Sequence, residues 1–132
     1  MEGLLSIRSR FGAIETMNRL EAAIRAEGMT VFAQIDHAAG AAEAGLELRP
    51  TELITFGNVR GGTPLMQSVQ TAGIDLPLKA LVWEDASGAT WLSYNEPSWI
   101  AQRHGVANAE PVVSKMSAAI SAISRKATEK AA

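Results

Sequence analysis

Apolar residues recur at intervals of three or four in two stretches of the chain, and this spacing predicts two amphipathic helices. The first covers residues 11–28, where Gly28 stands at the position of a left-handed helix stop. Its apolar face is predicted to consist of Phe11, Ile14, Met17, Leu20 and Ile24. The second covers residues 111–130, with apolar positions at Val113, Met116, Ile120, Ile123 and Ala127. Because this second stripe is short for a coiled coil, we expect it to pack on the domain's own sheet.

Strands are predicted at residues 4–9, where apolar and polar residues alternate weakly, and at residues 29–35 and 51–56, which are richer in β-branched and aromatic residues. Towards the C-terminus, the stretch PSWIAQRHG predicts a short helix that ends at Gly105. Strands and helices therefore alternate along most of the chain.

Two further short helices are predicted beside these strands. Asp36 can cap an alanine-rich helix that Gly45 ends, and its small side chains suit close packing against a sheet. After the third strand, the loop GNVRGGT leads into a helix predicted over residues 64–73. Thr63 is a good N-cap residue for this helix, and Pro64 is favoured at its first position.

Residues 76–97 predict a β-hairpin, with two β-rich runs on either side of a turn that contains Ser87 and Gly88. If the loop has three residues and the glycine is left-handed, Val82 lies opposite Leu92. One face of the hairpin is then apolar and is expected in the core: Leu78, Ala80, Val82, Leu92 and Tyr94.

The other face of the hairpin places Trp83 opposite Trp91, with Lys79 opposite Asn95 nearby. It is either a partly exposed face with an aromatic pair, or the lining of a pocket or self-association surface, where tryptophan is enriched. A lysine beside the two rings would be partly desolvated, which suits anion binding or Schiff-base chemistry.

The order of elements predicts an α+β fold, a two-layer sandwich in which helices pack on a small mixed or mainly antiparallel sheet. The last two strands share a tight turn and must be antiparallel. We expect a single domain over residues 1–132, with residues 111–130 as its C-terminal amphipathic helix.

Composition narrows the classes of function. The chain has 132 residues, 47% apolar and 20% charged, which is typical of a soluble globular protein. A net charge of -2 gives no basic surface for nucleic acid, and no apolar run approaches a membrane span. The absence of cysteine excludes disulfides and thiolate chemistry. The N-terminal stretch is a poor signal peptide, so a cytoplasmic location is expected.

The loop GNVRGGT resembles a phosphate-binding loop from which the lysine is missing. Gly62 stands directly before Thr63, where that lysine would be, and Arg60 lies inside the loop. The loop is therefore either a capped strand-to-helix turn or an anion-binding helix N-terminus, and nucleotide hydrolysis is not favoured.

Metal and hydrolase chemistry find no support in the sequence. The two histidines, His37 and His104, show no ligand spacing with nearby acidic residues, so no metal site is predicted. His104 near a helix end can interact with the helix dipole. No nucleophile-elbow motif is present.

Several stretches together resemble the bacterial and archaeal family known as domain of unknown function 302. They are VFAQIDHAAGAAEAGLELRPTELITFGNVRGGTPLMQ, DLPLKALVWED and WLSYNEPSWIAQRHG, within residues 29–105. Family members usually carry proline where this chain has Val59. The resemblance implies a small α+β fold, often a homo-oligomer, and no established activity. The matching motif positions are Asp36, His37, Asn58, Gly62, Thr63, Pro64, Leu76, Pro77, Lys79, Tyr94 and Asn95.

These observations predict a small-molecule binding domain, and they identify no cofactor. The expected ligand is a small anion, with Lys79 supplying charge and the helix N-terminus supplying amide donors. The predicted site comprises Asn58, Arg60, Gly62, Thr63, Lys79 and Asn95, with His37 and Tyr94 as neighbours. One alternative is a homodimeric interaction module that uses the tryptophan face or the C-terminal stripe. Another is an enzyme with Lys79 as nucleophile or base, assisted by His37 or Tyr94.

Overall fold

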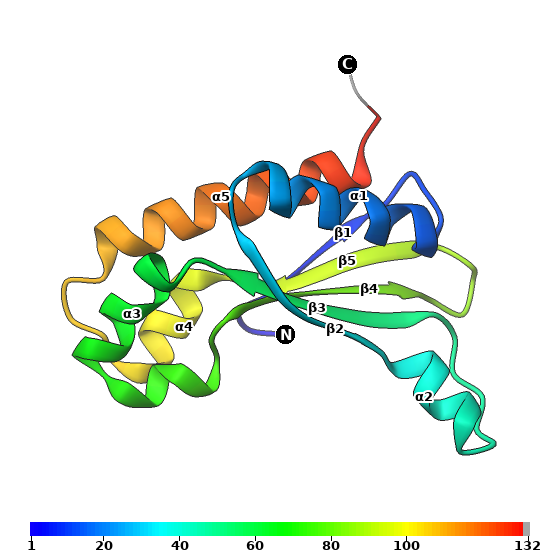
Figure 1. Ribbon diagram of the computed structural model, residues 1–132, viewed down its shortest axis with the longest axis horizontal. Helices are drawn as coiled ribbons and strands as arrows, with labels where there is room; N and C mark the ends of the chain where they lie inside the picture. The colour runs from blue at the N-terminus through cyan, green and yellow to red at the C-terminus, as the bar shows by residue number, and fades with distance from the viewer. Residues whose placement is uncertain (131–132) are drawn as a thin grey trace.

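The computed structural model describes residues 1–130 as one five-stranded sheet with helices on one face and at one end (Figure 1). The last two residues of the predicted single domain lie outside the described part. The strands are β1 (Leu4–Arg8), β2 (Thr30–Asp36), β3 (Thr51–Gly57), β4 (Leu78–Glu84) and β5 (Thr90–Asn95). Their order is β1-β5-β4-β3-β2, and every neighbouring pair is antiparallel. The predicted α+β two-layer sandwich is confirmed.

The helices are α1 (Ala13–Ala26), α2 (His37–Glu43), α3 (Val59–Ser68), α4 (Pro97–His104) and α5 (Glu110–Thr128), with a 3₁₀ helix η1 (Gln70–Ile74). In Figure 1, α1 and α5 lie side by side over one face of the sheet, whereas α3, η1 and α4 gather at one end. The core lies between the sheet and the α1–α5 layer. It includes the fully buried Leu20, Ile54, Phe56, Leu92 and Ile120.

The predicted hairpin register is confirmed. Ala80 lies opposite Tyr94, Val82 opposite Leu92, and Trp83 opposite Trp91. Gly88 has φ +88°, the left-handed conformation that the three-residue loop requires. The face that carries Val82 and Leu92 is buried in the core.

The apolar stripe of α5 packs in the chain's own core as predicted, since Val113, Ile120, Ile123 and Ala127 are buried. The stripe predicted for α1 is partly wrong, because the side chain of Ile14 is 81% exposed. At about 100° per residue, position 14 lies a third of a turn away from Leu20. The buried face instead includes Thr16 and Ala23.

The helix predicted over residues 64–73, with Thr63 as N-cap, is wrong in its start and its continuity. The helix begins five residues earlier, at Val59, because the Asn58 side chain accepts a hydrogen bond from the Arg60 backbone N–H at 2.9 Å and caps α3. Pro64 lies inside α3, and the extended Val69 separates α3 from η1.

Helix α2 lies beside β3 but buries no residue against the sheet, although its small side chains had suggested close packing. Asp36 caps it as predicted, accepting a hydrogen bond from the Ala39 N–H at 2.9 Å, and Gly45 is left-handed. No residue of α2 is buried, and Figure 1 shows it projecting from the end of β2. Alanines bury little area per residue, so this short helix has no strong apolar face with which to dock.

Candidate functional site

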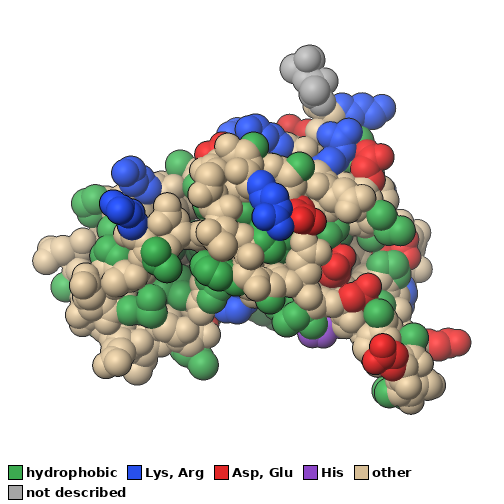
Figure 2. Space-filling model, viewed as in Figure 1, with side chains coloured by type: hydrophobic (Ala, Val, Ile, Leu, Met, Phe, Trp, Pro, Cys, Tyr) green, Lys and Arg blue, Asp and Glu red, His purple; other side chains and the backbone are tan. Residues whose placement is uncertain are grey.

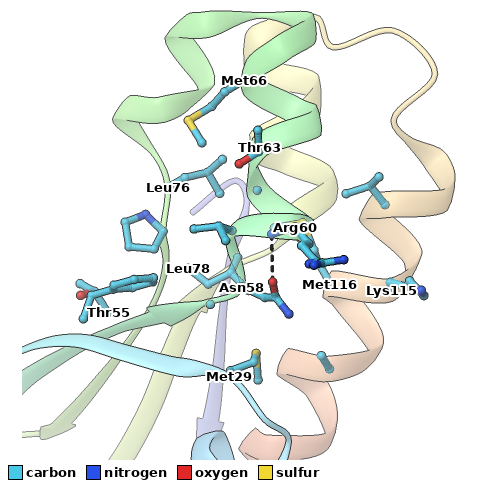
Figure 3. Close-up of a pocket in the computed structure, with 18 residues that line it drawn as sticks. Met29, Thr55, Asn58, Arg60, Thr63, Met66, Leu76, Leu78, Lys115 and Met116 are labelled. Carbon is cyan, nitrogen blue, oxygen red and sulfur yellow. Dashed lines mark hydrogen bonds between the residues drawn. The ribbon is translucent and has the colours of Figure 1, made fainter.

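A cavity of about 890 Å³ lies between α3 and α5 beside the ends of β2 and β3. The lining comprises Met29, Phe32, Thr55, Gly57, Asn58, Val59, Arg60, Gly61, Gly62, Thr63, Met66, Leu76, Pro77, Leu78, Val112, Lys115, Met116 and Ala119. Most of these side chains are apolar, and none is acidic. Figure 3 shows Met29, Met66 and Met116 around this cavity, which we call the methionine pocket. Methionine is flexible and polarisable, so such a wall adapts to apolar ligands of different shape.

Two cations lie at the rim of the methionine pocket, on the two helices that border it. In Figure 3, Arg60 extends from α3 towards α5, which carries Lys115. Both residues are exposed, and neither forms an ion pair within residues 1–130. Figure 2 shows apolar side chains gathered around a hollow over α3, with Lys or Arg side chains at its edge. The rim can therefore attract an anionic group while the interior offers a mostly apolar surface.

The start of α3 shapes the wall of the methionine pocket. The Asn58 C=O accepts hydrogen bonds from the Gly61 and Gly62 N–H groups at 2.8 and 3.1 Å, and these bonds close the first turn. The two glycines add no side chain, which leaves the cavity open beside the backbone. A Cβ at Gly62 would come within 3.7 Å of Leu76, whereas one at Gly61 would meet nothing within 4 Å.

Lys79 and Asn95 line a second, smaller hollow of about 280 Å³ on the sheet face that carries no helix. Trp83 also lines it and stacks on Trp91, with ring centroids 6.1 Å apart and planes inclined at 22°. Trp83 Nε1 donates to Ser93 Oγ at 2.8 Å and so fixes its ring over β5. The hollow adjoins the methionine pocket along the cross-strand pair of Thr55 and Lys79.

The structure thus divides the predicted site residues between three places. Asn58, Arg60, Gly62 and Thr63 line the methionine pocket, whereas Lys79 and Asn95 line the smaller hollow, to which Tyr94 also contributes. His37 is exposed at the start of α2 and lines neither.

Tyr94 lies in the hydrophobic core with 7% of its surface exposed. Burial, and to a lesser extent the charge of Glu96, raises the pKa of its phenol above the ordinary value. A phenolate at neutral pH is therefore disfavoured. In the part of the chain that the structure describes, no three His, Asp or Glu side chains gather as metal ligands would.

Sequence reasoning missed Lys115 and the wall that α5 contributes to the methionine pocket. A second stripe of α5, at Val112, Lys115, Met116 and Ala119, follows the i, i+3, i+4, i+7 spacing of one helix face. This spacing can be read from the sequence, but the more apolar stripe that enters the core is the stronger signal on the same helix.

Comparison with known proteins assigns the family. Residues 5–123 match the family described as "Domain of unknown function DUF302". The chain belongs to this family. A solved structure described as "Crystal structure of uncharacterized conserved protein DUF302 from Bacillus stearothermophilus" superimposes with a TM-score of 0.85. The two chains are 19% identical, and the match covers 96% of this chain and 99% of the other. The likeness therefore shows a shared fold.

Curated relatives of this DUF302 chain carry a different name. It is 51% identical over 113 residues to "Fluoride-specific ion channel FluC 1" of Brucella suis biovar 1 (strain 1330), and equally to the protein of that name in Brucella abortus biovar 1 (strain 9-941). The match covers 86% of this chain and 44% or 42% of those proteins, so the chain spans less than half the length of the curated relatives. Within residues 1–130, no helix is long and apolar enough to cross a membrane.

Proposed function

We propose that this DUF302 domain binds an amphipathic anion, a small molecule with an apolar body and a carboxylate or phosphate head. The observation that carries the proposal is the methionine pocket, which combines an apolar interior with two cations at its rim and no acidic lining residue. Ligand pockets are typically of 300–1,000 Å³ and mostly apolar, with a few polar groups that orient the ligand. A cavity of about 890 Å³ falls in this range.

In this arrangement the apolar body would contact Met29, Met66 and Met116, and the acidic head would lie between Arg60 and Lys115. Arg60 can hold a carboxylate or phosphate through two parallel hydrogen bonds, whereas Lys115 supplies a compact charge. Asn58 Oδ1 is occupied by the Arg60 N–H, which leaves its amide N–H₂ group as a donor. The charge that the sequence assigned to Lys79 is here assigned to Arg60 and Lys115.

The test is isothermal titration with octanoate, with 1-octanol as the uncharged control and inorganic phosphate as the head group alone. We expect octanoate to bind most tightly, because only it satisfies both the apolar interior and the charged rim. Arg60→Ala and Lys115→Ala should each lower the affinity for octanoate about tenfold. This is at the low end of the effect of a charge-assisted hydrogen bond, because both side chains are exposed. Octanol binding should be unchanged.

Lys79→Ala is the matched control, since it removes a cation from the adjoining hollow. If this variant loses octanoate while Arg60→Ala and Lys115→Ala retain it, the smaller hollow is the site. Ala119→Leu should fill the methionine pocket from α5 and block octanoate and octanol alike. Failure of every ligand to bind, or unchanged binding in all these variants, would contradict the proposal.

The name of the curated relatives justifies including fluoride in the same titrations. Fluoride has no apolar body, so a site for it would not need the methionine pocket. We propose that fluoride alone gives no signal and that any coupling to a channel would act through the longer chain in those relatives. If adding fluoride evolves heat and Arg60→Ala abolishes that heat, the ligand is a small anion and the proposal of an amphipathic ligand is wrong.

We also propose self-association through the helix-free face of the sheet, since the stripe of α5 is buried in the chain's own core. This face carries the half-buried Leu81, Trp83 and Trp91, and Ile35 is 45% exposed. Aromatic residues are enriched in such interfaces. Light scattering should report a dimer that Trp83→Ala weakens, and a monomer at high concentration would exclude it. We further propose that the domain functions in the cytoplasm.

Lysine chemistry remains an alternative. The half-buried Lys79 would form a Schiff base with a carbonyl substrate in the smaller hollow. Borohydride trapping followed by mass spectrometry would locate the adduct. An adduct on other lysines alone would contradict this alternative.

A further inference from the structure

A carboxylate, an imidazole and a hydroxyl form one hydrogen-bonded chain where η1 meets α4. His104 Nε2 lies 2.6 Å from Asp75 Oδ2, and His104 Nδ1 lies 3.0 Å from Thr71 Oγ1. Thr71 belongs to η1, Asp75 follows it directly, and His104 ends α4. None of these residues lines the methionine pocket or the smaller hollow.

The charge of Asp75 decides which nitrogen of His104 carries the proton. Burial raises the pKa of this carboxyl group, but the hydrogen bond from His104 and the charge of Arg103 outweigh burial, so the pKa lies below its ordinary value. An ionised carboxylate only accepts hydrogen bonds, so the proton of neutral His104 resides on Nε2. Nδ1 is then a free base, and it accepts the Thr71 O–H.

The surroundings hold this arrangement in place and leave one end open. Arg103 donates to both oxygens of Asp75, at 3.0 and 2.8 Å, and its guanidinium lies over the Trp99 ring at 5.6 Å. The side chains of His104 and Asp75 are 9% and 12% exposed. Thr71, in contrast, is exposed, so its hydroxyl can meet a reagent from solvent.

We propose that Thr71 is an activated nucleophile that accepts an acyl group, with His104 as its general base and Asp75 as the residue that positions the imidazole. Nucleophile, base and orienting group within hydrogen-bond reach of one another are the geometric signature of covalent catalysis.

In the reaction, Thr71 Oγ attacks the carbonyl carbon of an activated ester while its proton passes to His104 Nδ1. The carbon–oxygen bond to the leaving alcohol breaks, and the alcohol departs as an anion with the bonding electrons. The imidazolium proton is released to solvent or to the leaving group. Water then attacks the acyl-threonine with His104 again as base, which regenerates Thr71 and yields the free acid. Ester and water are consumed, and acid and alcohol are formed.

The substrate class follows from what the site supplies. Thr71, His104 and Asp75, which we call the relay, provide a nucleophile and a base. Esters whose alcohol leaves readily as an anion therefore suit the relay, whereas the amine of an amide needs an acid to protonate it before it leaves. p-Nitrophenyl acetate is therefore the probe. The expected intermediate, trapped by acid before water attacks it, is a protein whose mass is increased by one acetyl group, located on Thr71 by peptide mapping.

Three variants test the relay. Thr71→Val keeps the shape of the side chain and should abolish the adduct, and Thr71→Ser should retain it. His104→Gln keeps a donor towards Asp75 but removes the base, and should slow acylation about a hundredfold, within the range for general-base catalysis. Circular dichroism and thermal melting will confirm that each variant folds.

Two controls separate the relay from background reactivity. Ser114 is an exposed hydroxyl bonded to Glu110 without an imidazole, and it should not be acylated. His37→Asn removes the other histidine and should leave the rate at Thr71 unchanged. No acyl group on Thr71, or an equal rate in His104→Gln, would overturn the proposal.

The role of Asp75 has its own readout. Asp75→Asn keeps the size of the side chain but removes the charge that fixes the His104 proton on Nε2, so the rate of Thr71 acylation per folded molecule should fall. A merely structural role of Asp75 would lower the amount of folded protein without lowering the rate per folded molecule, and that result would overturn its role as a positioning residue.

Discussion

Individual side chains differ sharply in how much of the fold depends on them. Within α1, Ile24 is fully buried in the core, whereas Ile14 on the same helix is 81% exposed. Periodicity places apolar residues three or four apart on one side of a helix, but it does not say where the covering sheet ends. Burial, rather than spacing, therefore decides which isoleucine stabilises the domain.

This difference predicts unequal costs for the same truncation. Ile24→Ala should lower the free energy of unfolding by about 2–5 kcal/mol, because it leaves a cavity in the core. Ile14→Ala should change it by less than about 0.5 kcal/mol, as is usual for exposed positions. Urea denaturation followed by circular dichroism measures both. Equal losses would mean that Ile14 contacts the core in solution.

A second effect at the residue scale concerns Glu52, which lies opposite Asp36 in the β2–β3 pair. Burial first, and then the charges of Asp36 and Glu21, raises the pKa of Glu52. A carboxyl group with a raised folded-state pKa binds its proton more tightly in the folded chain, so its charge destabilises the fold once pH exceeds that pKa.

Glu52→Gln should therefore raise the melting temperature at pH 7 and have little effect at a pH below the ordinary pKa of glutamate. Thermal melts at both pH values measure the change. Glu47→Gln, on the exposed segment after α2, is the control and should change neither. A stabilisation of Glu52→Gln that is independent of pH would show that charge is not the cause.

At the scale of elements, α3 shows how local chemistry sets the limits of a helix. Asn58 caps it, and the two glycines that resemble a loop are part of its first turns. The sequence indicated a capped start near this point but assigned the cap to Thr63, because Pro64 is favoured at a first helical position. Pro64 instead lies past the first turn of α3, where proline has no backbone N–H to donate, and the Asn58 cap begins the helix at Val59.

Replacing Gly61 tests the revised helix. Gly61 lies inside α3, and a Cβ there meets nothing within 4 Å. Gly61→Ala should stabilise the chain by about 0.5–1 kcal/mol, which raises the melting temperature by a few degrees. Gly105→Ala is the matched opposite, because Gly105 has φ +64° at the end of α4 and should be destabilised by the same change. A loss of stability in Gly61→Ala would contradict the helical assignment.

The β4–β5 hairpin depends on Asp85 at its turn. Its carboxylate accepts hydrogen bonds from Trp91 Nε1 at 2.8 Å, from the Ser87 hydroxyl at 2.7 Å, and from the Ser87 and Ala89 N–H groups at 2.9 and 3.0 Å. The Trp91 bond, followed by those from Ser87 and Ala89, holds the pKa of Asp85 well below its usual range.

A lowered carboxyl pKa contributes stability that is present above the unfolded-state pKa and is lost as pH falls through the folded-state value. The turn should therefore persist into strongly acidic solution. Asp85→Ala should lower the melting temperature at pH 7 and increase hydrogen exchange at the Ala89 N–H. Glu84→Ala, on the neighbouring residue, is the control. Unchanged exchange in Asp85→Ala would show that the turn residues alone maintain the hairpin.

For the whole molecule, α5 has two roles that lie on different faces. One face buries Ile120 and Ile123 in the core, and the adjacent face presents Lys115 and Ala119 to the methionine pocket, with Met116 at the boundary between the two. The pocket wall is thus part of the same layer that closes the core, and the stability of the domain and the shape of the cavity are linked.

Ile120→Asp should consequently unfold the domain rather than separate two subunits. An unpaired buried charge costs more than about 4 kcal/mol, a large part of the 5–15 kcal/mol that stabilises a typical domain. Circular dichroism should report lost structure at room temperature. Ala118→Asp, on the exposed side of α5, is the control and should stay folded. If Ile120→Asp is folded and monomeric, the apolar stripe of α5 is a subunit contact instead of part of the core.

The sequence by itself determined the class of fold, the hairpin register and the order of most elements. These features depend on local chemistry, namely helical and strand periodicity, the turn at Gly88 and the caps at Asp36 and Gly28. Side-chain periodicity also assigned the hairpin faces correctly, since neighbouring positions on a strand point to opposite sides.

Tertiary structure decided which residues meet. Asn58 and Lys79 are predicted as one site but line separate hollows, while Lys115 reaches the methionine pocket from a helix more than fifty positions later than Asn58 in the chain. The relay of Thr71, Asp75 and His104 depends on the packing of η1 against α4. Such contacts are set by how the helices pack at one end of the sheet, and local sequence patterns do not specify that packing.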